Sequence, residues 1–436
     1  LAIIDLSPLG SQPMLSPDKR YSIIYNGEVY NYLEIRNELI KKGYQFISKT
    51  DTEVVLNSFI EWGQECLDRF NGMWAFVIYD REKQELFCSR DRFGVKPFYY
   101  YYDKDQFVFA SEIPPLLATL KSKASVDREV MFDYMIYNRT DQSERTFFSG
   151  IKKLQHSHTL RVSLKDGTVL LQRWYDLKKR LRSSIPFENA ESFRETFTSA
   201  VGLRLRSDVP VGVCLSGGLD SSSITSTLLK KFNYRDLNTF SAVYEKGQVG
   251  DESEFINEYR PFIEKMNFIT PTADSLYKDL TNFIGTQAEP FPTTSIYAHY
   301  KVMELAKKHV VVTLDGQGAD EAMGGYPYFF GFYYKELLAQ IRLLKLFKEL
   351  KDYWSNHHST YAYKTFLYFL LPGRLKKSVR IREKGYLTRD FSNHEFHSLI
   401  SQELYSSQTV NAALINHFEY KMEHLLKWQD LNSMKF

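Results

Sequence analysis

The spacing of hydrophobic and polar residues differs between the first and second parts of this chain of 436 residues. In the first part the apolar runs are short and have the spacing of antiparallel strands: 73–79, 86–89, 97–102 and 107–110. Two longer segments, 32–43 and 51–63, repeat apolar residues at the helical period and end in glycine, which commonly follows a helix. This part of the chain therefore predicts an antiparallel sheet sandwich with helices.

Beyond about residue 186 the rhythm changes to strands that alternate with helices. The expected elements are helix 187–205, strand 210–215, helix 221–232, strand 238–244, helix 252–265, a long helical stretch at 274–308 and strand 310–314. This alternation is typical of a parallel sheet with crossover helices, and a mostly helical region is expected from 326 onward. The polar stretch 176–186, which ends in proline, is the expected linker. We therefore predict two domains, an antiparallel α+β sandwich at 1–165 and a parallel α/β domain at 186–436.

Composition excludes several classes of partner. The 56 basic and 53 acidic residues nearly balance, so nothing predicts binding to nucleic acid or to a membrane surface. The apolar stretch 365–373 is too short to cross a bilayer. Cys66, Cys88 and Cys214 show no metal-site or disulfide spacing, which favours a reducing compartment such as the cytoplasm. We expect all three cysteines to be packing residues.

Two features of the first part allow both a structural and a functional interpretation. Asn26-Gly27 lies between strand-like residues, and Asn-Gly is a strong signal for a tight hairpin turn. Asp51 or Thr52 stands at the start of an expected helix, where such residues cap the helix N-terminus. Local sequence alone favours the turn and the cap.

The sequence VGVCLSGGLDSSSIT at 211–225 predicts a strand that leads into a phosphate-binding loop. The loop supplies glycines for close backbone approach and hydroxyl donors, namely Ser216, Gly217, Gly218, Ser221 and Ser222. It has no lysine of the kind that a Walker A loop carries. Asp220 would repel phosphate unless Mg²⁺ lies between them, so the loop predicts a bridging metal. The alternative is a cluster of helix-capping residues.

A second stretch, VVVTLDGQGADEAMGGY at 310–326, repeats this scheme. An apolar strand is followed by a turn with Asp315, Gly316 and Gly318, and then by the acid pair Asp320-Glu321. Because ligands bind at the carboxyl ends of parallel strands, the two strand ends predict a shared site for one nucleotide and one metal. The alternative for the acid pair is a solvated first helical turn, where the helix dipole favours acidic residues.

Taken together, these motifs resemble a known family. Residues 216–222 look like the PP-loop of ATP pyrophosphatases, which split ATP between the α and β phosphates. Combined with 310–326, GDESEF at 250–255 and LLKWQDLNSMKF at 425–436, the chain resembles the glutamine-hydrolysing asparagine synthase family. In the first part, YNGEVYN, DTEVV, FNGMWAFVIYD and RDRFGVKPFYYY are similar to that family's class II glutamine amidotransferase domain, which has an Ntn-type fold. The resemblance runs almost from end to end.

The resemblance implies a ligase that uses ATP and Mg²⁺, with aspartate, glutamine and ATP as substrates. Leu215 and Val243 would line the adenine pocket, Asp315 and Gly316 would contact the nucleotide, and 216–222 would hold the phosphates. Asp220 and Asp320 would carry Mg²⁺. The aspartate β-carboxylate would attack the α-phosphorus to give β-aspartyl-AMP, and ammonia would then displace AMP. Gln317 stands where some relatives have glutamate, and a positioning role is expected for it.

For the amidotransferase part, the resemblance implies an oxyanion hole at Asn26 and Gly27 and a site for the glutamine amino group at Glu28 and Asp51. The family's nucleophile is an N-terminal cysteine, whereas Leu1 stands first here. The family also continues beyond NSMKF into sequence that helps to form the aspartate site. We therefore interpret the sequence as truncated at both ends, and we expect residues 1–436 alone not to hydrolyse glutamine.

Two alternatives stay open. A relative with the same chemistry would act on another carboxylate, such as a sugar, a peptide or a β-lactam precursor, since the acceptor pocket is expected mostly beyond Phe436. A non-catalytic regulatory relative would keep the fold without the reaction, although the intact 216–222 loop and the Asp320-Glu321 pair argue against it. The resemblance is also compatible with a homodimer.

Overall fold

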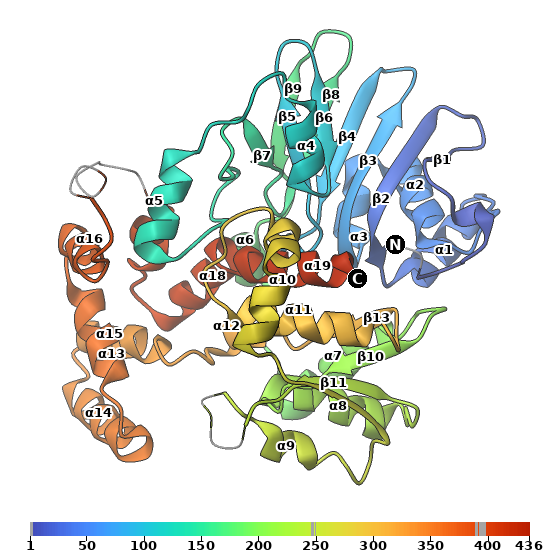
Figure 1. Ribbon diagram of the computed structural model, residues 1–436. Coiled ribbons are helices and arrows are strands. Elements are labelled where there is room, and N and C mark those ends of the chain that lie inside the picture. Colours follow the sequence, from blue (N-terminus) through green and yellow to red (C-terminus); the bar gives the residue numbers. More distant parts are fainter. Residues whose placement is uncertain (1–2, 246–247, 249, 389–390, 392–397) are drawn as a thin grey trace. The chain divides into compact units, whose positions relative to one another are not determined.

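The computed structural model describes residues 3–245, 248, 250–388, 391 and 398–436. Leu1, on which the interpretation of a truncated start depends, lies outside the described residues. The chain forms two compact units, whose elements are labelled in Figure 1. The first unit comprises Leu1–Leu116, Leu154–Gly316 and Lys427–Phe436, and the second comprises Leu117–Lys153 and Gln317–Leu426. The domain boundaries expected from sequence, at 165 and 186, stay a prediction.

A six-stranded antiparallel sheet forms the N-terminal part of the first unit. Its strands, in spatial order, are β1 (Met14–Leu15), β2 (Tyr21–Val29), β3 (Gly72–Asp80), β4 (Glu85–Arg90), β8 (His158–Ser163) and β9 (Val169–Arg173). A hairpin of β5 (Tyr99–Tyr102) and β6 (Phe107–Ala110) lies beside this sheet (Figure 1). The helices of this part are α1 (Tyr32–Lys41), α2 (Asp51–Trp62) and α3 (Cys66–Arg69), with short 3-10 turns at Pro8–Gly10 and Gly63–Glu65.

The alternation of side chains along β3 explains why the sheet lies between two layers. Trp74 and Phe76 point to one face and pack in a core that includes residues of α1 and α2. Ala75 and Val77 point to the other face and share a core with Phe98 and residues of β5 and β6. The predicted antiparallel sandwich with helices is therefore confirmed.

The hairpin turn expected at Asn26-Gly27 is wrong. Both residues lie inside β2, which pairs with β3 without a break from Tyr21 to Val29. Glycine is needed here for a different reason, because a Cβ on Gly27 would come within 2.3 Å of the Met73 carbonyl oxygen. Close approach of two strands, and not a turn, selects this glycine.

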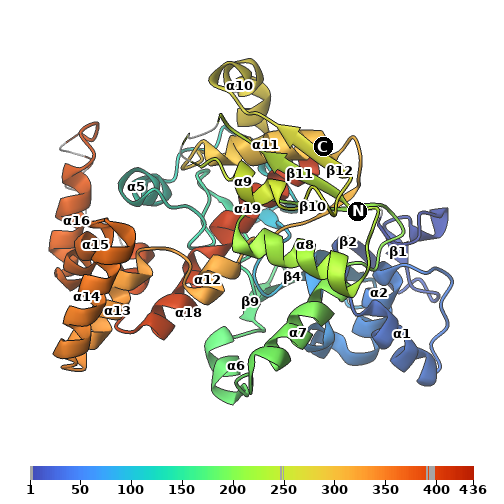
Figure 2. The same ribbon diagram turned by 90° about the horizontal axis from the view of Figure 1, so that it is seen from below.

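A four-stranded parallel sheet forms the second part of the first unit. Its spatial order is β12 (Lys265–Ile269), β11 (Asn238–Ala242), β10 (Val211–Cys214) and β13 (Val312–Leu314). Its helices are α7 (Ala190–Leu203), α8 (Leu219–Lys231), α9 (Ser253–Asn257), α10 (Ala273–Gln287) and α11 (Ser295–Ala306). Val213 packs in a core with residues of α7 and α8, whereas Cys214 packs on the opposite face with residues of α11. Figure 2 shows α8 and α11 on opposite sides of this sheet.

The prediction that the strands near 210–215, 238–244 and 310–314 share one parallel sheet is confirmed. The structure adds detail at two other places and contradicts one expectation. The helix expected at 252–265 ends at Asn257, and strand β12 follows it. The long helical stretch expected at 274–308 consists of two helices, separated by residues 288–294. The linker expected at 176–186 contains helix α6 (Leu177–Ser183), whose N-terminus is capped by Asp176.

The second unit is mostly helical, as expected beyond residue 326. Its described elements include α5 (Arg128–Tyr137), β7 (Ile151–Lys153), α12 (Ala319–Met323), α13 (Phe329–Ala339), α14 (Leu343–His357), α15 (Tyr361–Leu370), α16 (Gly373–Arg382), a π-helix at Ile400–Leu404 and α18 (Val410–Tyr420). Two elements cross the boundary between the units, α4 (Ile113–Thr119) and α19 (Met422–Lys435). Among the described helices, none combines the length and the apolar composition needed to cross a lipid bilayer.

The chain end returns to the first unit and packs there. Trp428 shares a core with Phe283 and Tyr300. Lys96 of the N-terminal part forms a buried ion pair with Asp430 of α19, with 2.7 Å between Nζ and Oδ1. Residues of α19 therefore pack by apolar contacts in the parallel-sheet part and reach the N-terminal part through this ion pair.

Candidate functional site

The predicted phosphate loop lies between β10 and α8, at the carboxyl end of the parallel sheet. Gly217 has φ +88°, a conformation that glycine adopts without strain. Gly218 is the N-cap of α8 and its position carries no side-chain cap. Ser216 Oγ and Ser221 Oγ are 3.0 Å apart, and Ser221 Oγ donates to the Gly218 carbonyl oxygen at 3.2 Å. Backbone N–H groups at such a helix start, with hydroxyl donors beside them, provide an anion site without a lysine.

Residues of two other motifs of the synthetase part, Glu252 and Gly316, pack directly against this loop. A Cβ on Gly217 would come within 2.9 Å of the Glu252 carbonyl oxygen, so the GDESEF segment lies beside the loop. A Cβ on Gly316 would come within 2.9 Å of Asp220 Cβ and 3.0 Å of the Ser221 nitrogen. The structure therefore brings 216–222, Glu252 and Gly316 together, although they are far apart in sequence.

The residues expected at the adenine pocket follow adjacent strands. Leu215 is fully buried after β10, and its N–H donates to the Phe240 carbonyl oxygen of β11 at 2.9 Å. Val243 follows β11 and its N–H donates to the Ile269 carbonyl oxygen at 2.9 Å. Both residues thus lie at one edge of the sheet, where nucleotides bind in parallel α/β folds. Their contact with adenine stays a prediction.

The residues expected to hold Mg²⁺ lie in different units. Asp220 is in the first turn of α8, in the first unit, and Gly218 rather than Asp220 occupies the cap position. Asp320 is in the first turn of α12, in the second unit. Carboxylate oxygens, with the serine hydroxyls of the loop, are the donors that Mg²⁺ prefers, so the residue types fit this metal. The joint site stays a prediction.

The acid pair Asp320-Glu321 is not a solvated helical turn. Glu321 is fully buried, and Tyr326 Oη donates to its Oε1 at 2.5 Å. Asp320 Oδ1 lies so close to Gly325 that a Cβ there would come within 1.9 Å of it. The solvated alternative is therefore wrong for Glu321. Gln317 is exposed, and its role stays a prediction.

A buried lysine, Lys421, lies beside Glu321 and was not predicted from the sequence. Lys421 Nζ donates to Tyr328 Oη at 2.8 Å and lies 3.6 Å from the centroid of the Tyr326 ring. Its Nζ is 3.9 Å from Glu321 Oε1. Burial, aided by the charge of Arg139, lowers the pKa of Lys421 to about 7. A lysine poised near neutrality is typical of functional sites, but no spacing in the sequence links it to Glu321.

In the amidotransferase part, Asp51 does not cap α2. Thr50 is the N-cap, and its side chain accepts from the Glu53 nitrogen. The Asp51 carboxylate instead reaches β2, where Oδ2 accepts from Tyr25 Oη at 2.8 Å and from the Val29 nitrogen at 2.9 Å. The expectation of a helix cap is wrong, because the helix start is used to hold a carboxylate beside the strand.

Glu28 and Asp51 form a buried pair of acids. Both side chains are almost fully buried. Burial, followed by the charge of Asp51, raises the pKa of Glu28 to about 8, while Lys96 and Arg204 oppose this rise. Burial also raises the pKa of Asp51. Two desolvated carboxylates of this kind favour a cationic ligand, and the amino group of glutamine would be one.

The remaining predicted residues of this part are placed but not tested. Asn26 Nδ2 donates to Ser111 Oγ at 3.3 Å, and Gly27 is buried in the strand. Their role as an oxyanion hole stays a prediction. The cysteines are free and buried, as expected for packing residues. Burial raises the pKa of Cys66 and of Cys88, which argues against reactive thiolates at these positions.

Comparison with known proteins identifies two domains along the chain. The model of the glutamine amidotransferase domain matches residues 1–175, and the model of the asparagine synthase family matches residues 192–435. Asparagine synthetase (glutamine-hydrolyzing) 3 of Bacillus subtilis is 36% identical over 347 residues, 76% of this chain and 56% of that protein. A Methanocaldococcus jannaschii protein, provisionally named asparagine synthetase (glutamine-hydrolyzing) 2, is 35% identical over 343 residues, 75% of this chain and 65% of that protein.

A relative with a different name is also similar. Amidase chry2 of Gibberella zeae is 28% identical over 353 residues, 76% of this chain and 51% of that protein. The chain thus spans between about half and two thirds of the length of these relatives. The family matches follow the order of the two predicted parts, an Ntn-type antiparallel sandwich and then a parallel α/β sheet with a PP-loop. The chain belongs to the asparagine synthase family, and its N-terminal part is a glutamine amidotransferase domain.

Proposed function

We propose that the full-length protein is a glutamine-dependent asparagine synthase of the cytoplasm. Its reaction would convert ATP, L-aspartate, L-glutamine and water into AMP, diphosphate, L-asparagine and L-glutamate. The aspartate β-carboxylate would displace diphosphate from the α-phosphorus to give β-aspartyl-AMP. Ammonia released from glutamine would then displace AMP from that acyl group.

The observation that carries the proposal is the contact between two strand ends of one parallel sheet. Gly316, after β13, packs against Asp220 and Ser221 at the start of α8. One nucleotide could therefore contact both loops, with its phosphates at the α8 N-terminus. The backbone donors there stabilise negative charge as it grows on the leaving diphosphate, which lowers the barrier to adenylation.

Asp220 and Asp320 would hold Mg²⁺ in this proposal. The metal, when bound, supplies positive charge that neutralises the diphosphate oxygens. Asp220 alone would repel the phosphates, and its place in the first turn of α8 is therefore better explained with a cation than without one.

The acid pair of the other part supports glutamine as the nitrogen source. Glu28 and Asp51 are desolvated and lie near each other, so an ammonium group between them would relieve their repulsion. Asn26 and Gly27, on the same strand as Glu28, would stabilise the oxyanion that forms from the glutamine amide.

The proposal is tested with the full-length protein, Mg²⁺, ATP, aspartate and glutamine. We expect AMP, diphosphate, asparagine and glutamate in equal amounts, measured by chromatography and mass spectrometry. Replacing glutamine by ammonium should still give asparagine, since only the synthetase part is then required. ADP and phosphate as products would contradict the PP-loop assignment, and AMP formation only with another carboxylate would identify a different acceptor.

A further inference from the structure

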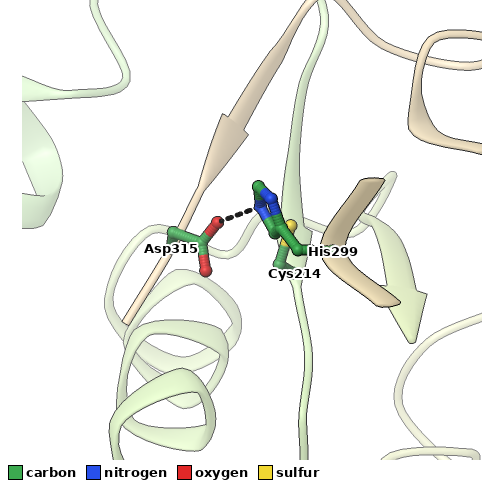
Figure 3. A group of neighbouring side chains, drawn as sticks. All are labelled: Cys214, His299 and Asp315. Carbon is green, nitrogen blue, oxygen red and sulfur yellow. Dashed lines mark ion pairs between the residues drawn. The ribbon is translucent and has the colours of Figure 1, made fainter. Parts of the chain in front are cut away.

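Three polar side chains meet at the carboxyl edge of the parallel sheet, and one of them, His299, lies outside the motifs that the sequence singled out. Cys214 is the last residue of β10, Asp315 follows β13, and His299 lies on α11. Their ligand atoms all lie within 4.8 Å of one another. Figure 3 shows the imidazole of His299 facing the carboxylate of Asp315, with 3.5 Å between Nε2 and Oδ2.

Two buried side-chain amides, those of Asn432 and Gln287, lie beside His299 and determine which ring nitrogen carries the proton. Asn432, fully buried on α19, has its Nδ2 at 3.0 Å from the Ile296 carbonyl oxygen and at 3.2 Å from His299 Nδ1. Its Oδ1 accepts from Gln287 Nε2 at 2.8 Å. The Ile296 carbonyl can only accept, so the amide nitrogen of Asn432 must face it.

This orientation decides the histidine tautomer. Because Asn432 Nδ2 offers an N–H to His299 Nδ1, that ring nitrogen must accept, and the ring proton therefore sits on Nε2. Among the described residues Nε2 makes no hydrogen bond, and Asp315 Oδ2 lies 3.5 Å from it. The ring N–H therefore lies beside one oxygen of the carboxylate, just beyond the usual hydrogen-bond distance.

The same details argue against a metal site, although cysteine, histidine and aspartate are zinc ligands. If Nε2 bound a metal, the ring proton would be on Nδ1 and an acceptor would have to face Nδ1. Asn432 instead presents a donor to Nδ1. A metal also needs a thiolate, whereas burial, aided by the negative charge of Asp315, raises the pKa of Cys214. The geometry therefore places Cys214 and His299 as two potential donors beside one carboxylate.

The position of Asp315 indicates which part of a nucleotide it would meet. A carboxylate repels phosphates and accepts from hydroxyl groups. In the sheet order, β13 and β11 lie on opposite sides of β10, so Asp315 and Val243 are about 10 Å apart across the strands. With adenine near Leu215 and Val243, the ribose is the donor-bearing group on the side of Asp315.

We propose that His299 is a positioning residue of the nucleotide site, which holds Asp315 so that its free oxygen accepts from the ribose hydroxyls. Asn432 and Gln287 support this role by keeping the ring proton on Nε2. The inference rests on the proposed function, because the contact of Asp315 with the nucleotide is part of it. It adds a specificity for ribose to that site.

The test compares the binding of AMP and of 2′,3′-dideoxy-AMP to the full-length protein by calorimetry. AMP is used because it lacks the diphosphate, so the result does not depend on Mg²⁺. We expect wild type to prefer AMP by about 10-fold, the effect of one or two hydrogen bonds to a charged group. His299→Leu should lose most of that preference and raise the KM for ATP more than it lowers kcat. His299→Gln, whose amide can replace the Nε2–H donor, should recover it to within about 3-fold.

Each outcome separates the inference from the function on which it rests. If wild type binds neither AMP nor ATP, the proposed function fails whatever His299 does. If wild type prefers AMP and His299→Leu keeps the full preference, the positioning role is wrong. Equimolar zinc in the purified protein, lost in both His299 variants, would show a metal site instead. His309→Leu, which changes an exposed histidine just after α11, is the matched control and should leave the preference unchanged.

Discussion

Gly27 and Gly218 belong to the two candidate sites, yet the space around them differs. A Cβ on Gly27 would meet the Met73 carbonyl oxygen at 2.3 Å and Trp74 Cα at 2.7 Å, both on the neighbouring strand. A Cβ on Gly218 would meet only Ser216 Oγ, at 3.4 Å. The first glycine lets two strands approach, whereas the second leaves the start of a helix open. Glycine therefore supports a rigid scaffold in the amidotransferase domain and an accessible backbone in the synthetase part.

The acids of the two sites differ in the same way. Asp51 is held by hydrogen bonds from Tyr25 and Val29 inside the amidotransferase fold. Asp220 stands at a helix start beside loops whose residues are partly exposed. We infer that the glutamine site is built before its ligand arrives, and that the nucleotide site depends more on what it binds. The four predictions that follow test this contrast.

The largest effect is expected where the two parts are joined. Lys96→Met would leave the Asp430 carboxylate buried without its partner, so the free energy of unfolding should fall by about 3–5 kcal/mol. Urea unfolding of the full-length protein measures this change. The double variant Lys96→Met/Asp430→Leu, which removes both charges, should recover most of the loss. A single variant as stable as wild type would show that the pair does not join the two parts.

The next effect is a loss of activity with little loss of stability. Asp220→Asn keeps the size of the side chain but removes the charge expected to hold Mg²⁺, so ATP-dependent asparagine formation should fall by at least ~100-fold. Because Gly218 is the cap of α8, the fold should lose only about 0.3–1 kcal/mol from the helix dipole. Glutaminase activity of the full-length protein should survive. A rate of asparagine synthesis within a few-fold of wild type would show that Asp220 has a structural role and does not hold Mg²⁺.

The pattern of apolar and polar residues predicts most of the fold because it reflects which positions are buried. Val211 and Val213 alternate with Gly212 and Cys214 between two helical layers, and such strands are recognisable without a structure. Strand β12 was missed because it lies at the sheet edge, where Lys265 is exposed and the remaining residues are only half buried. An edge strand of this kind lacks the apolar run that identifies a central one.

The candidate site is predictable only where a local motif carries it. The 216–222 loop is one continuous motif, and the structure places it as expected. The prediction of a turn at Asn26-Gly27 is wrong because the contact that requires glycine at position 27 comes from Met73, on another strand. His299 and Lys421 were missed for the same reason, since their partners Asp315 and Glu321 lie 16 and 100 positions away in sequence. Contacts of this range are created by the fold, so local patterns do not contain them.

The contrast between the glycines predicts a third result. Gly27→Ala must move backbone atoms of β2 or β3, so we expect it to lower the free energy of unfolding by about 1–3 kcal/mol or more. Gly218→Ala has room and a φ of −66°, so its thermal unfolding should stay close to wild type. Its affinity for diphosphate should fall instead, because the new methyl group stands at the start of the helix. Equal destabilisation by the two variants would contradict the contrast.

The last effect is a dependence of stability on pH in the amidotransferase domain. The pKa of Glu28 is about 8 in the folded protein, mainly through burial, against about 4.5 when unfolded. Between these values the folded state keeps a proton that the unfolded state has lost, so the contribution of Glu28 to stability is most favourable below pH 4.5 and declines as pH rises toward 8. Glu28→Gln, which is neutral throughout, should show a smaller fall in Tm from pH 5 to pH 8. Glutamine should stabilise wild type increasingly over that range, since its ammonium favours ionised Glu28, and the variant much less. Parallel Tm curves for the two proteins, with and without glutamine, would mean that Glu28 does not titrate there.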